Sequence, residues 1–206
     1  MKNWKHWAFV AVIAIVGIIM GFVACDNDNN KTTDNPVPDP TKLRLSGITV
    51  NIKDTPTLNN FGYFEAGTDV YKPLSDYITG TPKVEINDSK LTLVLDAPKE
   101  SVMYAINIPY GNIVVNPSDA KWFFIALCTP DSAYYMGIEN HDGTEVSLVY
   151  VDKDVNINGT SSAINYSNIS LKRGWNFLEI TSGSPNTYTK AAQTQPNSSI
   201  WTVIAY

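Results

Sequence analysis

Histidine and cysteine are scarce in this 206-residue chain, which has two of each. One histidine, His6, lies at the extreme N-terminus, so the rest of the chain contains only His141. A zinc site built on several histidines and the HExxH metalloprotease motif are thereby excluded. Two cysteines cannot form the disulfide network of a small cysteine-rich fold.

Charged residues are also few, at 17%, whereas 44% of the residues are hydrophobic. This composition is too apolar and too weakly charged for a disordered chain. The formal net charge is −5. That sign argues against nucleic-acid binding, which needs clustered lysine and arginine side chains to neutralise phosphates.

The chain starts with a short basic segment followed by an apolar run. Lys2 and Lys5 precede residues 8–24, in which no side chain is charged or polar. A basic segment and an apolar run in this order are typical of a secretory signal. The run is shorter than the roughly 20 residues that span a bilayer comfortably. It ends at Cys25, and the polar segment that follows begins with Asp26.

The end of the apolar run resembles the lipobox of bacterial lipoproteins, in which a small residue precedes a cysteine that is lipidated and becomes the N-terminus after cleavage. Ala24 and Cys25 match the essential pair, and Val23 also fits. Phe22 stands where the family usually has leucine. The resemblance is confined to residues 1–25.

The resemblance implies a signal peptide over residues 1–24 and a lipid on Cys25. It also implies a position in the bacterial cell envelope, outside the cytoplasm, at either the inner or the outer membrane. Two acyl chains hold a protein stably on a membrane, whereas one binds only reversibly. Two alternatives remain open, an uncleaved membrane helix and a signal peptide that is cleaved elsewhere.

The next segment is polar. Residues 26–42 contain one apolar residue apart from proline, Val37, and are rich in Asp, Asn and Thr. Such a segment buries too little surface to offset the entropy lost on ordering. We therefore expect the lipidated cysteine and a disordered tether over residues 25–42, followed by one domain over residues 43–206. A frayed terminus with no spacer role has the same pattern.

The rest of the chain has the alternating pattern of β-strands. Every second residue is apolar in several short segments, which include 91–95, 102–108, 146–150, 155–157 and 169–171. The segment 122–128 is apolar on both faces, which indicates a central strand covered on each side. No sustained helical period occurs, and residues 73–78 could form at most one helical turn. The pattern predicts an all-β domain, an antiparallel β-sandwich or a jelly-roll-like fold.

Three details of this domain can be predicted. The alternation slips at Ser46-Gly47, which indicates a β-bulge. Lys172-Arg173-Gly174 predicts a hairpin between the strands on either side of it. Cys128 is expected to be a buried, inert thiol, because cysteine is among the most buried residue types.

One segment has oxygen-bearing side chains at alternate positions, as a calcium loop does. These are the weak metal-site candidates Asp152, Asp154 and Asn156. An EF-hand loop would need glycine and glutamate where Ile157 and Ala163 stand. The alternative is a turn that leads into a short strand.

Catalytic residues are harder to identify. His141 and Asp142 could formally belong to a Ser–His–Asp triad, but no GxSxG motif is present and the neighbouring glycine favours a turn. Carboxylates for glycoside hydrolysis are paired in space and not in sequence, so no pair stands out. The available candidates are Glu65, Asp69, Glu139, Asp142 and Glu179.

Aromatic residues offer a route to ligand binding. Tyr134 and Tyr135, or the cluster over residues 61–64, could provide an exposed platform for sugar stacking. Packing in the core is the alternative for both groups.

These patterns favour a membrane-anchored lipoprotein, attached through Cys25, with a non-enzymatic binding or surface-interaction module for glycans, peptides or a partner protein. No cofactor is expected. A carboxylate-dependent hydrolase of glycans or the cell wall, and a purely structural envelope protein, remain alternatives. Removal of residues 1–24 would leave 13 basic and 20 acidic residues, so the processed protein would be more acidic than the full chain.

Overall fold

The computed structural model describes residues 39–52, 61–65, 70–106, 108, 111–130 and 134–205. The chain divides into two units, residues 1–36 and residues 37–206, and the described residues all belong to the second. The predicted signal peptide and Cys25 lie outside the described residues.

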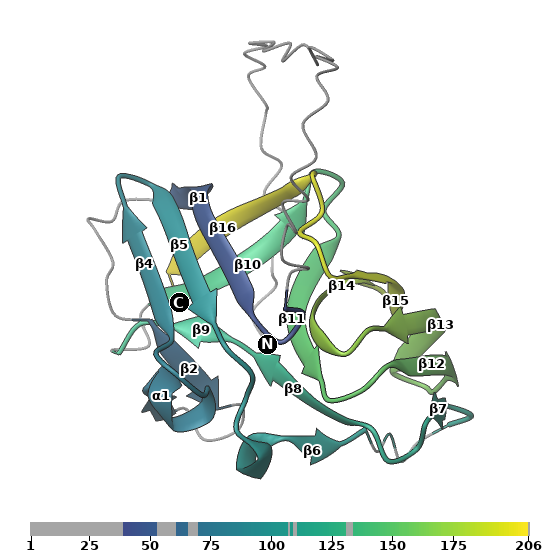
Figure 1. Cartoon of the computed structure of the whole chain (residues 1–206). Helices are drawn as coiled ribbons and strands as arrows, with labels where there is room; N and C mark the ends of the chain where they lie inside the picture. Colours follow the sequence, from purple (N-terminus) through teal and green to yellow (C-terminus); the bar gives the residue numbers. More distant parts are fainter. Residues whose placement is uncertain are drawn as a thin grey trace, which may run out of the picture. The chain divides into compact units, whose positions relative to one another are not determined.

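The described residues are mostly strands (Figure 1). The helical elements among them are α1 (Leu74–Tyr77) and the short 3₁₀ helix η1 (Glu100–Val102). The strands are β1 (Leu43–Ile52), β2 (Gly62–Glu65), β3 (Val70–Lys72), β4 (Lys83–Asn87), β5 (Lys90–Leu95), β6 (Tyr104–Ala105), β7 (Val114–Asn116), β8 (Lys121–Ile125), β9 (Leu127–Cys128), β10 (Tyr134–Asn140), β11 (Glu145–Val151), β12 (Val155–Thr160), β13 (Ile164–Leu171), β14 (Gly174–Thr181), β15 (Asn186–Ala192) and β16 (Ser199–Ala205). The all-β prediction is confirmed, and α1 confirms the single helical turn predicted within residues 73–78.

Hydrogen bonds connect these strands into one sheet. The order along its main path is β4-β5-β1-β16-β10-β11-β14-β15-β13-β12-β7. The shorter strands are attached to this path, since β8 pairs with β11 and β6, and β9 pairs with β10 and β2. Most neighbours are antiparallel, but β1–β16 and β13–β15 are parallel, which the sequence pattern did not predict. The finer prediction of a sandwich or jelly roll is not confirmed.

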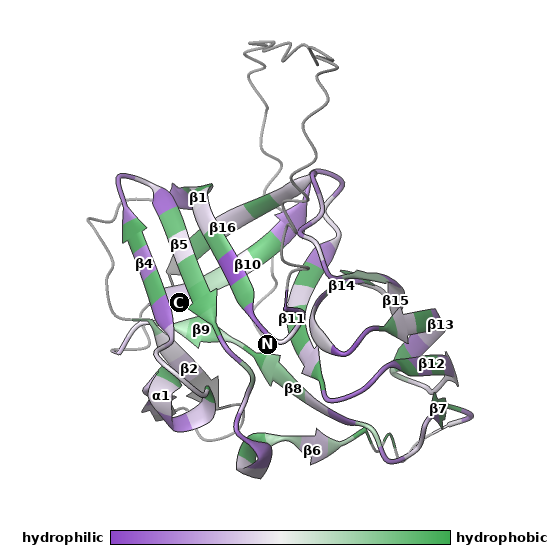
Figure 2. Ribbon diagram, in the orientation of Figure 1, coloured by the Kyte–Doolittle hydropathy of each residue, from purple (hydrophilic) through white to green (hydrophobic). Residues whose placement is uncertain are grey.

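Two hydrophobic clusters fill the domain, and the central strands contribute to both. On β11, Leu148 and Tyr150 belong to the first cluster, whereas Val149 and Val151 belong to the second. Successive side chains of a strand point to opposite faces, so both faces of β11 are covered. In Figure 2, β8 is largely green, and green bands alternate with paler ones along β11.

The two-faced segment predicted over residues 122–128 is confirmed by its burial. Trp122 packs in the second cluster and Phe123 in the first, and both are buried. Cys128, at the end of this segment, is fully buried as expected.

The predicted bulge is also confirmed. The register between β1 and β5 shifts between Ser46 and Ile48, and Gly47 has a φ of +71°. Glycine populates positive φ readily because it has no Cβ.

The predicted hairpin at residues 172–174 is wrong. Strand β15 lies between β13 and β14 in the sheet, so the strands on either side of this turn are not neighbours. The side chain of Asn176 fixes the turn, because its Oδ1 accepts from the N–H of Lys172 and its Nδ2 donates to the carbonyls of Lys172 and Gly174. Gly174 therefore begins β14, which pairs with β11 and β15 and not with β13.

Candidate functional site

Strands β10 and β11 enclose a cleft because they pair only at one end. A turn over residues 141–144 joins them, and Glu139 and Glu145 are the residue pair that faces across the two strands. Beyond this pair, β10 bonds to β9 and β11 bonds to β8. The segment β8–β9 passes from one strand to the other at Ala126 and forms the floor of the gap.

The gap contains a cavity of about 330 Å³. Its apolar lining includes Ile125, Leu127, Met136, Leu148 and Trp201, of which Trp201 is only 1% exposed. A small-molecule site typically has a volume of about 300–1,000 Å³, an apolar lining and a few polar groups. The cavity therefore has the size of a site for a small group.

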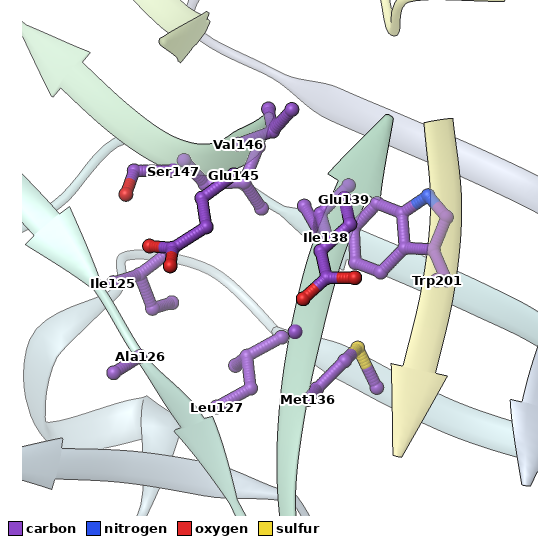
Figure 3. A pocket seen from close by; sticks show the side chains of 12 residues that line it. Ile125, Ala126, Leu127, Met136, Ile138, Glu139, Glu145, Val146, Ser147 and Trp201 are labelled. Atoms are coloured by element: carbon purple, nitrogen blue, oxygen red, sulfur yellow. The ribbon is translucent and has the colours of Figure 1, made fainter. Parts of the chain in front are cut away.

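Strand alternation places polar side chains at the opening. Glu139 and Gly137 share one face of β10, and Glu145 and Ser147 share the same face of β11. The residues between them, Ile138 among them, point to the first hydrophobic cluster. Figure 3 shows the two carboxylates at the opening on opposite sides of it, with the Ser147 hydroxyl on the side of Glu145.

The two glutamates carry like charges, and neither forms an ion pair with another described residue. Both residues are exposed, and none of the ion pairs among the described residues includes either of them. Glu145 accepts a hydrogen bond of 3.2 Å from the hydroxyl of Ser182. By contrast, Glu179 on the neighbouring β14 is 3.4 Å from the ammonium group of Lys190. Like charges directly opposite each other on neighbouring strands destabilise a sheet.

The turn at the closed end of the cleft is held by its own polar groups. The Asp142 carboxylate accepts from the N–H of Thr144, and its bonds to Thr144 lower the pKa of Asp142. His141 is exposed, and its backbone N–H donates to the carbonyl of Ser198. Asn140 is buried and accepts from the Ser198 hydroxyl. A turn, the alternative to a catalytic triad at His141 and Asp142, therefore accounts for these residues, since the Asp142 carboxylate accepts from Thr144 within the turn.

The weak metal-site candidates are engaged in other contacts. The Asp152 carboxylate accepts from the N–H of Lys121 at 2.8 Å. The Asp154 carboxylate accepts from the Lys172 ammonium and the Arg173 N–H, both at 2.8 Å, and these bonds lower the pKa of Asp154. Within the described ranges, no group of three or more His, Cys, Asp or Glu side chains could hold a metal.

Asn156 belongs to β12, where its side chain is exposed. Asp152 and Asp154 precede this strand, as the alternative of a turn followed by a short strand predicts. Asp152 and Asp154 therefore form hydrogen bonds within the domain.

The tyrosine candidates do not form a platform. Tyr134 and Tyr135 lie within β10 and not in a loop, so as neighbours on a strand they point to opposite faces. Tyr134 packs against the first hydrophobic cluster. In the 61–64 cluster, Phe61 is buried, and Tyr63 packs on Tyr77 with the ring centroids 4.4 Å apart. The packing alternative therefore holds for Tyr134, Phe61 and Tyr63.

Of the five carboxylates considered from sequence, Glu139 is the one that lines the cleft. Glu65 lies in β2, and Asp69 lies outside the described residues. Glu145 was missed. Its position could have revealed it, because Glu139 and Glu145 are both three residues from Asp142, and residues placed equally about the centre of an antiparallel hairpin face each other.

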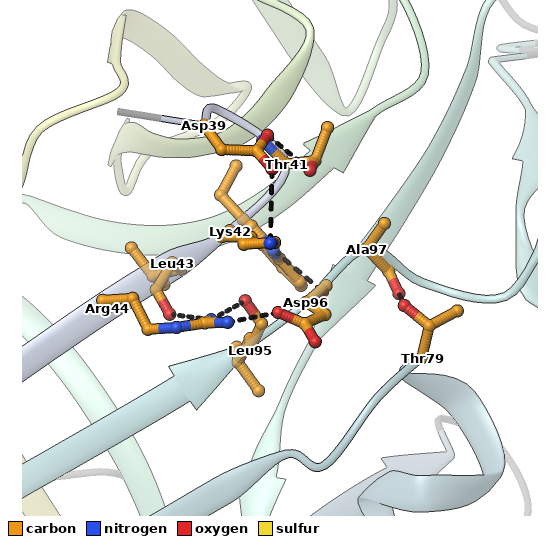
Figure 4. Close-up of polar contacts among 10 residues, drawn as sticks. Asp39, Thr41, Lys42, Leu43, Arg44, Thr79, Leu95, Asp96 and Ala97 are labelled. Carbon is orange, nitrogen blue, oxygen red and sulfur yellow. Dashed lines mark hydrogen bonds and ion pairs between the residues drawn. The ribbon is translucent and has the colours of Figure 1, made fainter. Parts of the chain in front are cut away.

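A second group of polar contacts lies where the chain enters the domain (Figure 4). The Arg44 guanidinium donates to the carbonyls of Leu43 and Leu95 and pairs with Asp96. The Asp39 carboxylate accepts from the hydroxyl and the N–H of Thr41, which lowers its pKa. These bonds satisfy local polar groups.

The last residues of the predicted tether contact the domain directly. The carbonyl of Pro40 accepts from the N–H of Trp175 at 3.0 Å. Gly174 has a φ of +103°, and a Cβ there would lie 1.9 Å from the Pro40 oxygen. Residues 39–42 are therefore hydrogen-bonded to the start of β14 or to one another.

None of the helices in the described part of the chain has the length and hydrophobicity needed to cross a membrane. No protein-family model, no curated protein and no solved structure matches this chain.

Proposed function

We propose that this protein is a lipid-anchored binding protein of the bacterial cell envelope, attached through Cys25, and that its β-domain binds a ligand in the cleft between β10 and β11. The observation that carries the binding function is the pair Glu139 and Glu145, which face each other above an apolar cavity. The anchor rests on the sequence of residues 1–25.

The arrangement of the cleft supports binding over a structural role. An uncompensated pair of like charges weakens the sheet, and the same hairpin could hold opposite charges at no cost in packing. Departures from locally favourable choices are expected mainly at functional sites. The cavity behind the two carboxylates would be filled by side chains in a purely structural hairpin, because protein interiors are packed to the density of organic crystals.

Hydrolysis is the second candidate, because two opposed carboxylates are also the machinery of glycosidases. A glycosidase needs one carboxyl group that stays protonated, usually through burial against apolar groups. Glu139 and Glu145 are both exposed. This exposure favours electrostatic binding over acid catalysis.

The cleft is tested by closing it. In the full-length protein, Gly137→Phe would place a large side chain on the face of β10 that carries Glu139, whereas Thr189→Phe adds the same ring at an exposed position of β15. A set of small cationic, neutral and anionic compounds is screened by ligand-observed NMR. At least one compound should bind the parent and the Thr189 variant but not the Gly137 variant.

Near-UV circular dichroism shows whether each variant is folded. If every compound that binds does so equally to a folded Gly137 variant, the cleft is not the binding site. Release of reducing sugar from a glycan substrate, lost in Glu139→Gln, would instead establish the hydrolase.

The anchor is tested in a bacterial host fed with radiolabelled palmitate. The parent chain should incorporate label, and Cys25→Ala should not and should accumulate as an unprocessed precursor. Cys128→Ala is the matched control, since that residue is fully buried and should leave labelling unchanged. Labelling of the Cys25 variant would refute the anchor.

A further inference from the structure

We infer that the cleft accepts a primary alkylammonium ion, with its ammonium group at the opening and its alkyl chain in the cavity. This inference rests on the proposed function, because it names the ligand class of the same cleft. It follows from the combination of an anionic opening and an apolar interior.

The opening provides acceptors for an ammonium group. Glu139 and Glu145 carry carboxylates on the same face of adjacent strands, and the Ser147 hydroxyl lies beside them on that face. An ammonium group has three N–H donors and no acceptor, so it can bond to two carboxylates and a hydroxyl at once. Its charge would also remove the repulsion between the two glutamates, which no cation in the described part of the chain does.

The interior selects the stem that carries the charge. Behind the glutamates the lining is apolar and includes Leu127, Met136 and Leu148. The alkyl chain of a free amine can enter this lining while its charged end stays between the carboxylates at the polar edge. The stem of a lysine side chain leads back to a peptide backbone, which would have to lie inside the cavity, so a free alkylamine is the ligand that fits. A ligand without an apolar part would leave this surface exposed to water.

A bare metal cation fits this opening less well. Calcium takes six to eight oxygen ligands, and no group of three candidate metal-ligating side chains occurs in the ranges that the structure describes. A sugar is also disfavoured, because stacking needs an accessible ring face and the aromatic ring in the lining, Trp201, is 1% exposed.

A guanidinium group is the closest competitor. It is planar and binds a single carboxylate through two parallel hydrogen bonds. The carboxylates of Glu139 and Glu145 approach from opposite sides of the opening (Figure 3). A compact group that presents donors in several directions suits this arrangement better than a planar fork.

The experiment uses the full-length protein in nonionic detergent and four probes. These are n-butylammonium, its N-acetylated form, n-butylguanidinium and the peptide acetyl-Gly-Lys-Gly-amide. Binding is followed by the indole N–H resonance of Trp201, assigned with Trp201→Phe. n-Butylammonium should shift this resonance, and N-acetylation should weaken binding about tenfold or more, because it removes the charge and its hydrogen bonds. The lysine peptide should bind more weakly than n-butylammonium, because its stem cannot enter the cavity while its ammonium group stays at the opening.

Charge variants test which residues recognise the ammonium. Glu139→Gln and Glu145→Gln should each weaken binding of n-butylammonium about three- to tenfold. Asp76→Asn, which removes an equal charge at an exposed residue of α1, should leave it unchanged. Raising the salt from about 0.05 M to 0.5 M should weaken binding further, since exposed charges are screened.

Several results would overturn the inference. They are equal binding of the N-acetylated amine, tighter binding of n-butylguanidinium, binding of the lysine peptide as tight as that of n-butylammonium, displacement of n-butylammonium by millimolar calcium, and no response to any probe. The Gly137→Phe screen separates these failures from failure of the proposed function. If that screen identifies a cleft ligand while the ammonium probes do not bind, the function stands and only the ligand class is wrong.

Discussion

The opposed glutamates should make the domain less stable than its neutral variants. Glu139 and Glu145 face each other across β10 and β11, and both are exposed. Cross-strand pairs contribute about 0.2–1 kcal/mol, with like charges destabilising by similar amounts. Solvent screening at exposed positions favours the lower half of that range. We therefore expect Glu139→Gln or Glu145→Gln to raise the free energy of unfolding by about 0.5 kcal/mol.

The double variant should be hardly more stable than either single variant, because the first substitution already removes the repulsion. A double-mutant cycle isolates this coupling. For a domain of this size, about 0.5 kcal/mol corresponds to roughly 1–2 °C in the melting temperature. The cycle is measured by urea unfolding and thermal melts at about 0.05 M and 1 M salt, and the coupling should vanish at high salt because the Debye length falls to about 3 Å.

A matched control should change in the opposite direction. Glu179→Gln removes the partner of Lys190, so it should leave stability unchanged or lower it slightly. The reasoning is refuted if both cleft variants are destabilised at low salt, or if their coupling does not depend on salt. Either result would mean that the two carboxylates are not close enough to repel each other.

Three further predictions concern the rest of the domain. Gly174→Ala should destabilise it by more than about 1 kcal/mol in urea unfolding, because φ is +103° and a Cβ would lie 1.9 Å from the Pro40 oxygen. Asn176→Ala should lower the free energy of unfolding by about 3 kcal/mol, since three hydrogen bonds of a residue 1% exposed are lost at about 1 kcal/mol each. Burial, and then its contacts with Tyr188, raise the pKa of Tyr166 above its ordinary value near 10. The unfolded chain therefore ionises first, and stability should fall as pH rises above about 10. Melting curves from pH 9 to 11 should show a weaker decline in Tyr166→Phe, and an unchanged decline would contradict this account.

Local features of the fold could be predicted from sequence because their causes are local. Alternating residues identify the faces of a strand, and a run such as residues 122–128 identifies a strand covered on both sides. The slip at Ser46-Gly47 predicted the bulge because one extra residue changes which face the side chains occupy. Each of these inferences depends on neighbours in the chain.

The neighbour of each strand could not be predicted in this way. Strand β15 inserts between β13 and β14, and β1 pairs in parallel with β16 from the far end of the chain. Alternation shows which face of a strand is apolar but contains no information on which strand bonds to its edge. The hairpin expected at residues 172–174 was wrong for this reason.

The candidate site could not be predicted for the same reason, because it depends on which strands are neighbours. Glu139 was one of several acidic residues considered, and nothing in its own sequence segment distinguishes it from Glu179. What distinguishes the two in the structure is the residue opposite, Glu145 in one case and Lys190 in the other. Pairing across strands decides whether a carboxylate is neutralised.

The cleft and the double core have a common origin in the segment from β8 to β9. This segment pairs with β11 over residues 122–125 and with β10 over residues 127–128. If this segment paired with β11 alone, β9 would not hold β10 apart from β11. Strands β10 and β11 could then pair along their whole length and close the cavity. Because it bonds to both strands, it keeps them separated, and its side chains Ile125 and Leu127 line the floor. The buried residues that make this segment apolar on both faces thus also maintain the cleft, so Glu139 and Glu145 can change without loss of the fold while the floor cannot.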